Sequence, residues 1–191
     1  NGLPESVTDR VRRSHEQWFH FVKESRYYSA VDEIREPYLG PLHAPGDRKV
    51  NTDRNDNDRV ARVFGNSLGR LPGSVWTVAT EPLIVPESLG VDHFAAFPTE
   101  LPKRIISAWC PSGGIVLDPF CGTGTTVAVA RALGCHGVGV DLSADYLRLA
   151  EWRVAGDGYR RVWAKVHDST TAAAPDPNQL NLFDWSRNDP D

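Results

Sequence analysis

The stretch "GGIVLDPFCGTGTTVAVARALGCHGVGVD", residues 113–141, constrains the fold more than any other part of this sequence. The apolar run "GGIVLD" ends in an acid and is typical of a central parallel strand. "TGTTVAVARALG" predicts a helix that ends at Gly134, and "HGVGVD" repeats the pattern of a strand followed by an acid. The stretch therefore predicts two parallel strands joined by a helix, the repeating unit of an α/β fold.

The flanking segments extend this alternation. "SADYLRLAEWRVA" predicts a helix capped by Ser143, "YRRVWAKVHD" a third strand, and "SVWTVAT" and "EQWFHFVK" further strands. "TELPKRIISAWC" predicts a helix with Thr99 as its cap and Pro102 in its first turn. Its apolar face is expected to comprise Leu101, Ile105 and Trp109. The sequence thus predicts a doubly wound α/β sheet.

Composition divides the chain into four zones. Residues 1–40 read as part of a sheet, with Ser6 as a helix cap near their start, and residues 41–75 are rich in Gly, Pro, Asn, Asp and Arg, which is typical of a long variable loop. Residues 76–170 carry the strand and helix alternation, and residues 171–191 form a Pro-, Asn- and Asp-rich tail. There is no methionine and the chain opens "NGLPESVTDR", so we expect it to be a piece of a longer protein.

Charge and cysteine usage exclude several classes. No apolar run approaches the roughly 20 residues that cross a bilayer, so no membrane span is expected. Cys110, Cys121 and Cys135 have no CxxC spacing, which predicts reduced thiols, a cytoplasmic location and no metal site. The net charge of −4 argues against coating nucleic acid through bulk charge, although it allows a local basic face.

The glycine-rich turn is the candidate ligand site. Ligands of open parallel sheets lie beyond the carboxyl ends of the strands, where Gly122 and Gly124 would let one approach the backbone. Asp141 ends the next strand, 19 residues after Gly122, a spacing at which a carboxylate accepts hydrogen bonds from ribose hydroxyls. A cofactor with a nucleoside is therefore predicted.

Charge indicates which cofactor. A dinucleotide requires a third glycine, where this chain has Val127, and Asp118 would repel its phosphates. No Lys followed by Ser or Thr comes after the glycines, so the turn is not a P-loop. S-adenosylmethionine has no phosphate and carries two positive charges. Asp118 suits it, Phe120 would lie against its cationic end, and Thr125 and Thr126 would donate to its carboxylate.

These residues, together with "HFAAFPTELPKRIISAWC" before them, resemble the amino-methylating DNA methyltransferases, which modify adenine N6 or cytosine N4. The order of motifs resembles the permuted class, whose catalytic motif precedes its cofactor motif. The resemblance implies a Rossmann-like S-adenosylmethionine-dependent methyltransferase fold, completed by upstream strands, and double-stranded DNA as the substrate. It also implies cofactor contacts, which with those above comprise Phe97, Pro98, Glu100, Leu101, Asp118, Phe120, Cys121, Gly122, Gly124, Thr125, Thr126, Asp141 and Leu142.

The family's catalytic loop, Asp-, Asn- or Ser-Pro-Pro-aromatic, has no counterpart in this sequence. The nearest strings, "EPYL" at Glu36 and "DPF" at Asp118, lack the second proline. We therefore assign no catalytic residue, expect the loop upstream of Asn1, and expect the isolated chain to be inactive. Cys121 is not expected to be a nucleophile, because methyl transfer in this family needs no covalent intermediate.

Several alternatives remain open. Arg48, Lys49, Arg54 and Arg59 are candidate DNA contacts, but the same loop also fits a solvated mixed-charge surface. The chain is either part of an enzyme or a non-catalytic module that binds S-adenosylmethionine or DNA as a partner subunit. A small-molecule methyltransferase is a more distant alternative, because fold does not fix substrate. The sequence leaves open whether the chain forms a homodimer.

Overall fold

The computed structural model describes residues 9, 15–38, 66–91 and 96–167. The elements in chain order are two short 3-10 helices, η1 (Val31–Ile34) and η2 (Glu87–Leu89), followed by α1 (Glu100–Trp109), β1 (Ile115–Asp118), α2 (Thr125–Ala132), β2 (His136–Gly139), α3 (Ala144–Ala155) and α4 (Gly158–Val166). The described part of the chain is therefore a mixed α/β structure. Its longest helix has 12 residues, and none of the described helices is long and apolar enough to cross a membrane.

The strand, helix and strand predicted from residues 113–141 are confirmed. β1 pairs in parallel with β2, and Leu117 lies opposite Val138 in the register. α2 connects the two strands and is followed by Gly134, whose φ of 73° is a left-handed conformation that ends the helix. Ser143 caps α3 as predicted, since its hydroxyl accepts a hydrogen bond from Tyr146 N at 3.3 Å.

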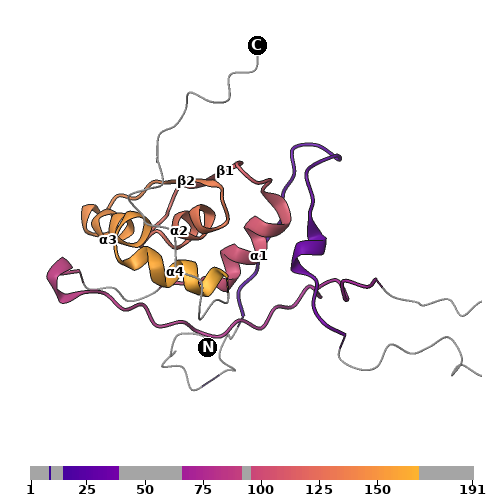
Figure 1. Ribbon diagram of the computed structural model, residues 1–191, viewed down its shortest axis with the longest axis horizontal. Helices are drawn as coiled ribbons and strands as arrows, with labels where there is room; N and C mark the ends of the chain where they lie inside the picture. Colours follow the sequence, from indigo (N-terminus) through magenta and orange to yellow (C-terminus); the bar gives the residue numbers. More distant parts are fainter. Residues whose placement is uncertain (1–8, 10–14, 39–65, 92–95, 168–191) are drawn as a thin grey trace, which may run out of the picture.

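Helix α2 is the centre of the packing. It contacts both strands and each of the other three α-helices, and Figure 1 shows it between the strands and α4. Three of its side chains, Ala128, Val129 and Ala130, are fully buried. Because alanines keep the helix surface narrow, neighbouring helices can approach it closely. The remaining core members are Ile106, Ala132, Cys135, Tyr159, Val162 and Val166.

The two faces of the sheet are packed differently. Val116 of β1 packs against the core. On the other face Ile115 and Leu117 are 65% and 62% exposed, and Val138 and Val140 are exposed as well. Helices therefore cover one face only in the part of the chain that the structure describes (Figure 1). A doubly wound sheet, which has helices on both faces, is not visible here.

The prediction of a third strand at "YRRVWAKVHD" was wrong, because this segment forms α4. Its buried residues Tyr159, Val162 and Val166 are spaced three and four positions apart, which is the period of a helix face. A half-buried strand would bury alternate residues. The apolar side chains were present, but their spacing was misread.

The strands predicted at "SVWTVAT" and "EQWFHFVK" were also wrong: neither segment forms a strand or a ladder with any described residue. In the first, Trp76 is half-buried and the Arg104 guanidinium lies 5.5 Å from its ring centre, whereas Val75 is exposed. In the second, Trp18, Phe19 and Phe21 are exposed. A strand needs a neighbour for its backbone hydrogen bonds, and neither segment has one among the described residues.

Helix α1 begins where predicted, but its cap differs. Thr99 occupies the N-cap position and its side chain does not cap the helix. Instead the Glu81 carboxylate accepts hydrogen bonds from Thr99 N at 3.0 Å and from its hydroxyl at 2.7 Å. The other oxygen of Glu81 pairs with Lys165 of α4, so one side chain joins the start of α1 to α4. The three residues of the predicted apolar face are only half-buried, whereas the buried residues of α1 are Pro102, Ile106 and Ala108.

The base of the predicted variable loop is closed by charged side chains. Glu36 and Arg70 form an antiparallel bridge through their backbones, with both N–H···O distances at 2.9 Å. The Glu36 carboxylate also pairs with Arg70 and with Arg104, and Arg104 pairs with Glu100 at 2.7 Å. This network ties both ends of the loop to α1. The candidate DNA contacts Arg48, Lys49, Arg54 and Arg59 and the predicted cap Ser6 lie outside the described residues.

Candidate cofactor site

The turn between β1 and α2 is held by its own acid. The Asp118 carboxylate accepts a hydrogen bond from Phe120 N at 3.1 Å, a local contact typical of Asp at the start of a turn. Gly122 and Gly124 then adopt left-handed conformations, with φ of 51° and 75°. Residues with a side chain rarely adopt these angles, so the two glycines let the chain reverse into α2.

The two glycines do different work. A Cβ on Gly124 would lie 2.7 Å from the Ala150 side chain, so this glycine is needed for α2 to pack against α3. A Cβ on Gly122 would meet nothing within 4 Å. The backbone at Gly122 is therefore open on the side where a side chain would point. Of the two predicted glycines, Gly122 is the one where a ligand can approach the backbone.

Asp141 connects the turn to the end of β2. One carboxylate oxygen accepts a hydrogen bond from Gly122 N at 2.8 Å, and the other accepts one from Ser143 N at 2.9 Å. These contacts fix the side chain beside the open glycine. A carboxylate has about four acceptor sites, so each oxygen can still accept from a further donor.

Two large apolar side chains flank the turn. Phe120 is 88% exposed, and Leu142, directly after Asp141, is fully exposed. Together with Asp118, Asp141 and Gly122, they place acidic and apolar groups at the carboxyl ends of both strands.

The two threonines at the start of α2 differ in direction. Thr125 is 2% exposed, and its hydroxyl accepts a hydrogen bond from Arg153 Nη1 at 2.7 Å. Thr126 is only half-buried. The geometry thus favours Thr126 over Thr125 as a ligand contact, since Thr125 faces the protein interior.

Cys121 is buried within the turn. Burial raises the pKa of its thiol, and the negative charges of Asp118 and Asp141 raise it further. The side chain is therefore a protonated thiol at neutral pH, which is the less reactive form. This agrees with the expectation that Cys121 is not a nucleophile.

The predicted contacts at residues 97–101 lie at the start of α1, which packs against α2. Phe97 is exposed, and Pro98 and Leu101 are half-buried. Glu100 is held by Arg104. No contact between these residues and the turn is seen in the described part of the chain, so their role at the site stays a prediction.

Sequence reasoning missed two residues that shape the site. Arg153 of α3 is only 5% exposed and donates from Nη1 to the Thr123 carbonyl at 3.0 Å and hydroxyl at 2.8 Å, supporting the turn from behind. Glu81 fixes the N-terminus of α1. An Arg on an otherwise apolar helix turn was a weak signal for the first, but nothing in the sequence distinguished Glu81 from other surface acids.

Within residues 9, 15–38, 66–91 and 96–167, no cluster of three His, Cys, Asp or Glu residues could hold a metal ion.

Comparison with known proteins gives a consistent family. The chain is 34% identical over 154 residues to the type II methyltransferase M.SmaI of Serratia marcescens, which covers 81% of this chain and 42% of that protein. It is 32% identical over 157 residues to M.Cfr9I of Citrobacter freundii, covering 82% and 42%. The chain thus spans about two fifths of the length of these relatives.

Solved structures are matched over shorter stretches. The PvuII cytosine-N4-specific DNA methyltransferase matches 51% of this chain and 39% of its own, with 17% identity and a TM-score of 0.40. The complex of M1.HpyAVI with SAM matches 30% and 28%, with 33% identity and a TM-score of 0.30.

The profile of the N6/N4 DNA methylase family matches residues 1–152. Because this match covers more than half of the sequence, the chain belongs to the N6/N4 DNA methylase family.

Proposed function

We propose that the chain is the cofactor-binding part of a DNA methyltransferase that transfers a methyl group from S-adenosylmethionine to the exocyclic amino group of adenine (N6) or cytosine (N4). The observation that carries the proposal is the open Gly122 backbone between Asp118 and Asp141, at the carboxyl ends of parallel strands, in a member of the DNA methylase family. The relatives are type II methyltransferases.

The residues present fit this cofactor. Two carboxylates flank the turn, and no Lys or Arg approaches the exposed side of Gly122 among the described contacts, which suits a cationic ligand better than a phosphate. We assign the ribose hydroxyls to Asp141 and the cationic methionine end to Asp118 and Phe120. Thr126, at the start of α2, is placed to donate to the carboxylate of the cofactor.

The chemistry supplied by the bound cofactor is an electrophilic methyl group on sulfur. This chain's residues hold and orient it. Asp141 is kept in position by Gly122 N and Ser143 N, so little freedom is lost when a ligand binds. On this proposal the attacking amino group is presented in line by residues outside this sequence, because the Pro-Pro-aromatic loop is absent from it.

We further propose that the remainder of the protein covers the exposed sheet face and completes a doubly wound, Rossmann-like fold. Ile115, Leu117, Val138 and Val140 expose an apolar surface that a parallel sheet ordinarily buries. The lengths of the relatives leave room for this second half, since the chain spans about two fifths of each.

A calorimetric titration with S-adenosylmethionine tests the cofactor assignment. Asp141→Asn keeps the shape of the side chain but removes its charge and one acceptor, and we expect the Kd to rise by about tenfold or more, since hydrogen bonds to charged groups contribute about 1.5–3 kcal/mol. Asp145→Asn is the matched control, because Asp145 is exposed on α3 and pairs only with Arg148 among described residues. Equal affinities for all three proteins would refute the assignment.

A non-catalytic binding module is the second candidate, favoured by the missing Pro-Pro-aromatic loop. Methyl transfer to DNA separates the two functions. The 191 residues alone should transfer no methyl group, whereas the complete polypeptide should. A complete polypeptide that binds S-adenosylmethionine without turnover would establish the binding module instead.

We propose that the variable loop contacts DNA through Arg48, Lys49, Arg54 and Arg59. Each phosphate contact contributes about 0.9 to the slope of log K against log salt. Replacing all four residues by Ala should therefore lower DNA affinity and flatten the slope. If the slope is unchanged, the loop is a solvated surface.

A further inference from the structure

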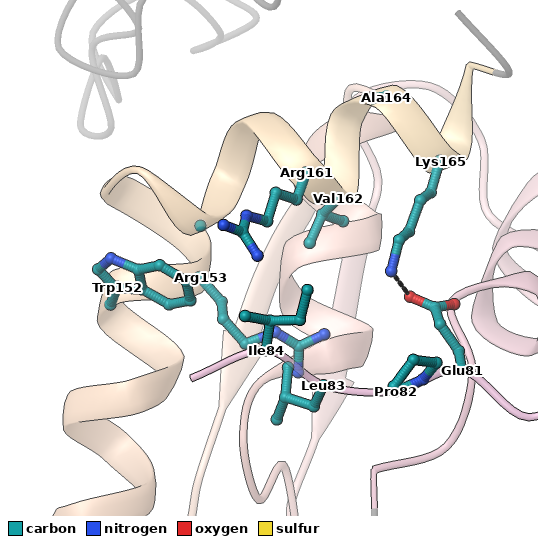
Figure 2. A pocket seen from close by; sticks show the side chains of 11 residues that line it. Glu81, Pro82, Leu83, Ile84, Trp152, Arg153, Arg161, Val162, Ala164 and Lys165 are labelled. Carbon is teal, nitrogen blue, oxygen red and sulfur yellow. Dashed lines mark hydrogen bonds and ion pairs between the residues drawn. The ribbon is translucent and has the colours of Figure 1, made fainter. Parts of the chain in front are cut away.

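A cavity of about 270 Å³ lies between α4, the end of α3 and the segment 81–84, and none of the residues that line it is among those predicted to contact the cofactor. Its walls are mostly apolar, with Leu83, Ile84 and Val162 among them. Figure 2 shows the side chains of Arg153, Arg161 and Lys165 around it, with Glu81 at one end. Three cations and one anion thus line one small space.

These charges are unequally paired. Lys165 is neutralised by Glu81. Arg161 is exposed and makes no ion pair or hydrogen bond with any described residue, and Figure 2 shows its guanidinium directed into the cavity beside Trp152 and Ile84. Two positive charges, those of Arg153 and Arg161, therefore remain without an anion in the part of the chain that the structure describes.

Arg153 is the more informative of the two. The residue is only 5% exposed. Its hydrogen bonds to Thr123 and Thr125 all use Nη1. Nε and Nη2 donate to no described acceptor. They are also not among the fully enclosed nitrogens that lack a partner, such as Trp163 Nε1. Figure 2 shows the Arg153 guanidinium beside Ile84 in the wall of the cavity, so we take its unused Nε and Nη2 as available to a ligand there.

An unpaired buried charge is costly, and burial lowers the pKa of Arg153, with only the nearby charge of Glu81 opposing this. The Nε and Nη2 edge of a guanidinium is the edge that binds two oxygens of a carboxylate or phosphate. A second guanidinium, Arg161, faces the same space. Apolar walls strengthen the attraction for an anion, because they exclude water.

We propose that this cavity binds a phosphate group through Arg153 and Arg161, and that the group is a phosphodiester of the DNA backbone. The choice of DNA as the source rests on the proposed function. A phosphate fits better than a carboxylate because its oxygens point in several directions and can accept from two guanidiniums on different helices. The site lies on α3 and α4 and is separate in sequence from the variable loop of residues 41–75.

The first experiment measures DNA binding by the complete polypeptide that carries these residues, by fluorescence anisotropy over a series of salt concentrations. Arg161→Ala should weaken binding to all duplexes alike and lower the slope of log K against log salt by about one. Arg160→Ala is the matched control, because Arg160 is exposed, lies next to Arg161 on α4 and does not line the cavity. If both variants lower the slope equally, the effect is one of bulk charge and the proposal is overturned.

The second experiment distinguishes the source of the phosphate. Trp152 lines the cavity, so its indole N–H signal in a nitrogen-edited NMR spectrum, assigned with Trp152→Phe, reports on occupancy. Inorganic phosphate should shift this signal in the wild type and not in Arg161→Ala. A shift without any change in the DNA slope would assign the site to free phosphate and overturn the choice of DNA. No shift and no slope change would overturn the site altogether.

The failure of the proposed function has a different signature. A wild-type protein that binds neither S-adenosylmethionine nor DNA refutes the methyltransferase assignment, while the indole shift on adding phosphate still decides whether the cavity binds an anion. Arg161→Ala should leave the affinity for S-adenosylmethionine unchanged, since Arg161 is not among the residues assigned to the cofactor. Thermal melting of each variant confirms that the fold is intact.

Discussion

The two faces of the β1–β2 sheet differ in how far the described residues cover them. On the covered face, Val116 packs against the core built around α2, and Leu149 and Tyr159 beyond it are fully buried. On the other face, Ile115 and Leu117 are exposed to solvent. The exposed face carries the larger apolar side chains, Ile115, Leu117 and Val138, whereas the covered face carries Val116, Gly137 and Gly139, so the difference arises from what the rest of the chain provides to cover them.

Apolar side chains in a strand indicate that the strand is buried, but they do not indicate which part of the protein covers it. α2 covers one face because it directly follows β1 and returns to β2, which places it on that side of the sheet. Nothing in the described residues crosses to the other face. The proposed second layer would remove this asymmetry by covering the exposed face.

The largest effect is expected when a leucine is replaced by alanine on the covered side of the sheet and, for comparison, on the exposed face. Leu149→Ala removes a fully buried side chain and should lower the free energy of unfolding by about 3 kcal/mol. Leu117→Ala, on the exposed face, should change it by less than about 1 kcal/mol. Denaturant unfolding of the 191-residue chain measures both. Equal losses would mean that the exposed face is covered in solution.

The two glycines of the turn sharpen the comparison further. Gly124→Ala forces a side chain into a left-handed conformation against Ala150, and the strain and overpacking together should cost about 2–3 kcal/mol. Gly122→Ala meets no neighbour and should cost about 1 kcal/mol. The affinity for S-adenosylmethionine should show the opposite order. For the same loss of stability, Gly122→Ala should raise the Kd for S-adenosylmethionine more than Gly124→Ala. Calorimetry alongside thermal unfolding separates the two quantities.

The element predictions succeeded where local chemistry decides the structure. Gly134 ends α2 and Ser143 caps α3 because a left-handed glycine and a capping hydroxyl act within a few residues. The strand at "SVWTVAT" failed because a strand depends on a distant partner that its own pattern does not reveal. α4 failed for a different reason, since the helical spacing of Tyr159, Val162 and Val166 was present in the sequence and was misread.

In the candidate site, too, the residues that could be inferred from local sequence differ from those whose contacts depend on packing. Asp118 and Asp141 were identified from the strand endings, and the structure places both beside the turn. The inward direction of Thr125 depends on Arg153, which lies 28 residues further along the chain. Glu81 and Thr99 are 18 residues apart. Contacts of this kind are fixed by packing, and the sequence offered no spacing from which to infer them.

A smaller effect is expected at Glu81, the polar link of the covered side. Burial raises the pKa of its carboxyl, but the hydrogen bonds from Lys165 and Thr99 outweigh burial and the net pKa is lowered. Its contribution to stability is therefore complete above the ordinary pKa of glutamate and is lost as the pH falls through the lowered value. Glu81→Gln should lower stability by about 1.5 kcal/mol at neutral pH and reduce the acid-side loss.

Glu87→Gln is the control for this measurement, because Glu87 is exposed and its carboxylate makes no hydrogen bond or ion pair with a described residue. It should leave the stability and its pH dependence unchanged. If Glu81→Gln and wild type lose stability in parallel between neutral and acid pH, the link between α1 and α4 is not the group that titrates.

The smallest effect, and the most direct test of the exposed face, is expected from Val138→Thr. This change replaces a methyl by a hydroxyl of similar size at a half-exposed position opposite Leu117, and in the 191-residue chain it should alter stability by less than about 0.5 kcal/mol. Val129→Thr buries the same hydroxyl in the covered core and should cost about 1–3 kcal/mol. In the complete polypeptide the cost of Val138→Thr should rise toward that of Val129→Thr, because a covering layer would deprive the hydroxyl of water. If Val138→Thr is neutral in both proteins, the face is solvated in both and the proposed second layer is absent.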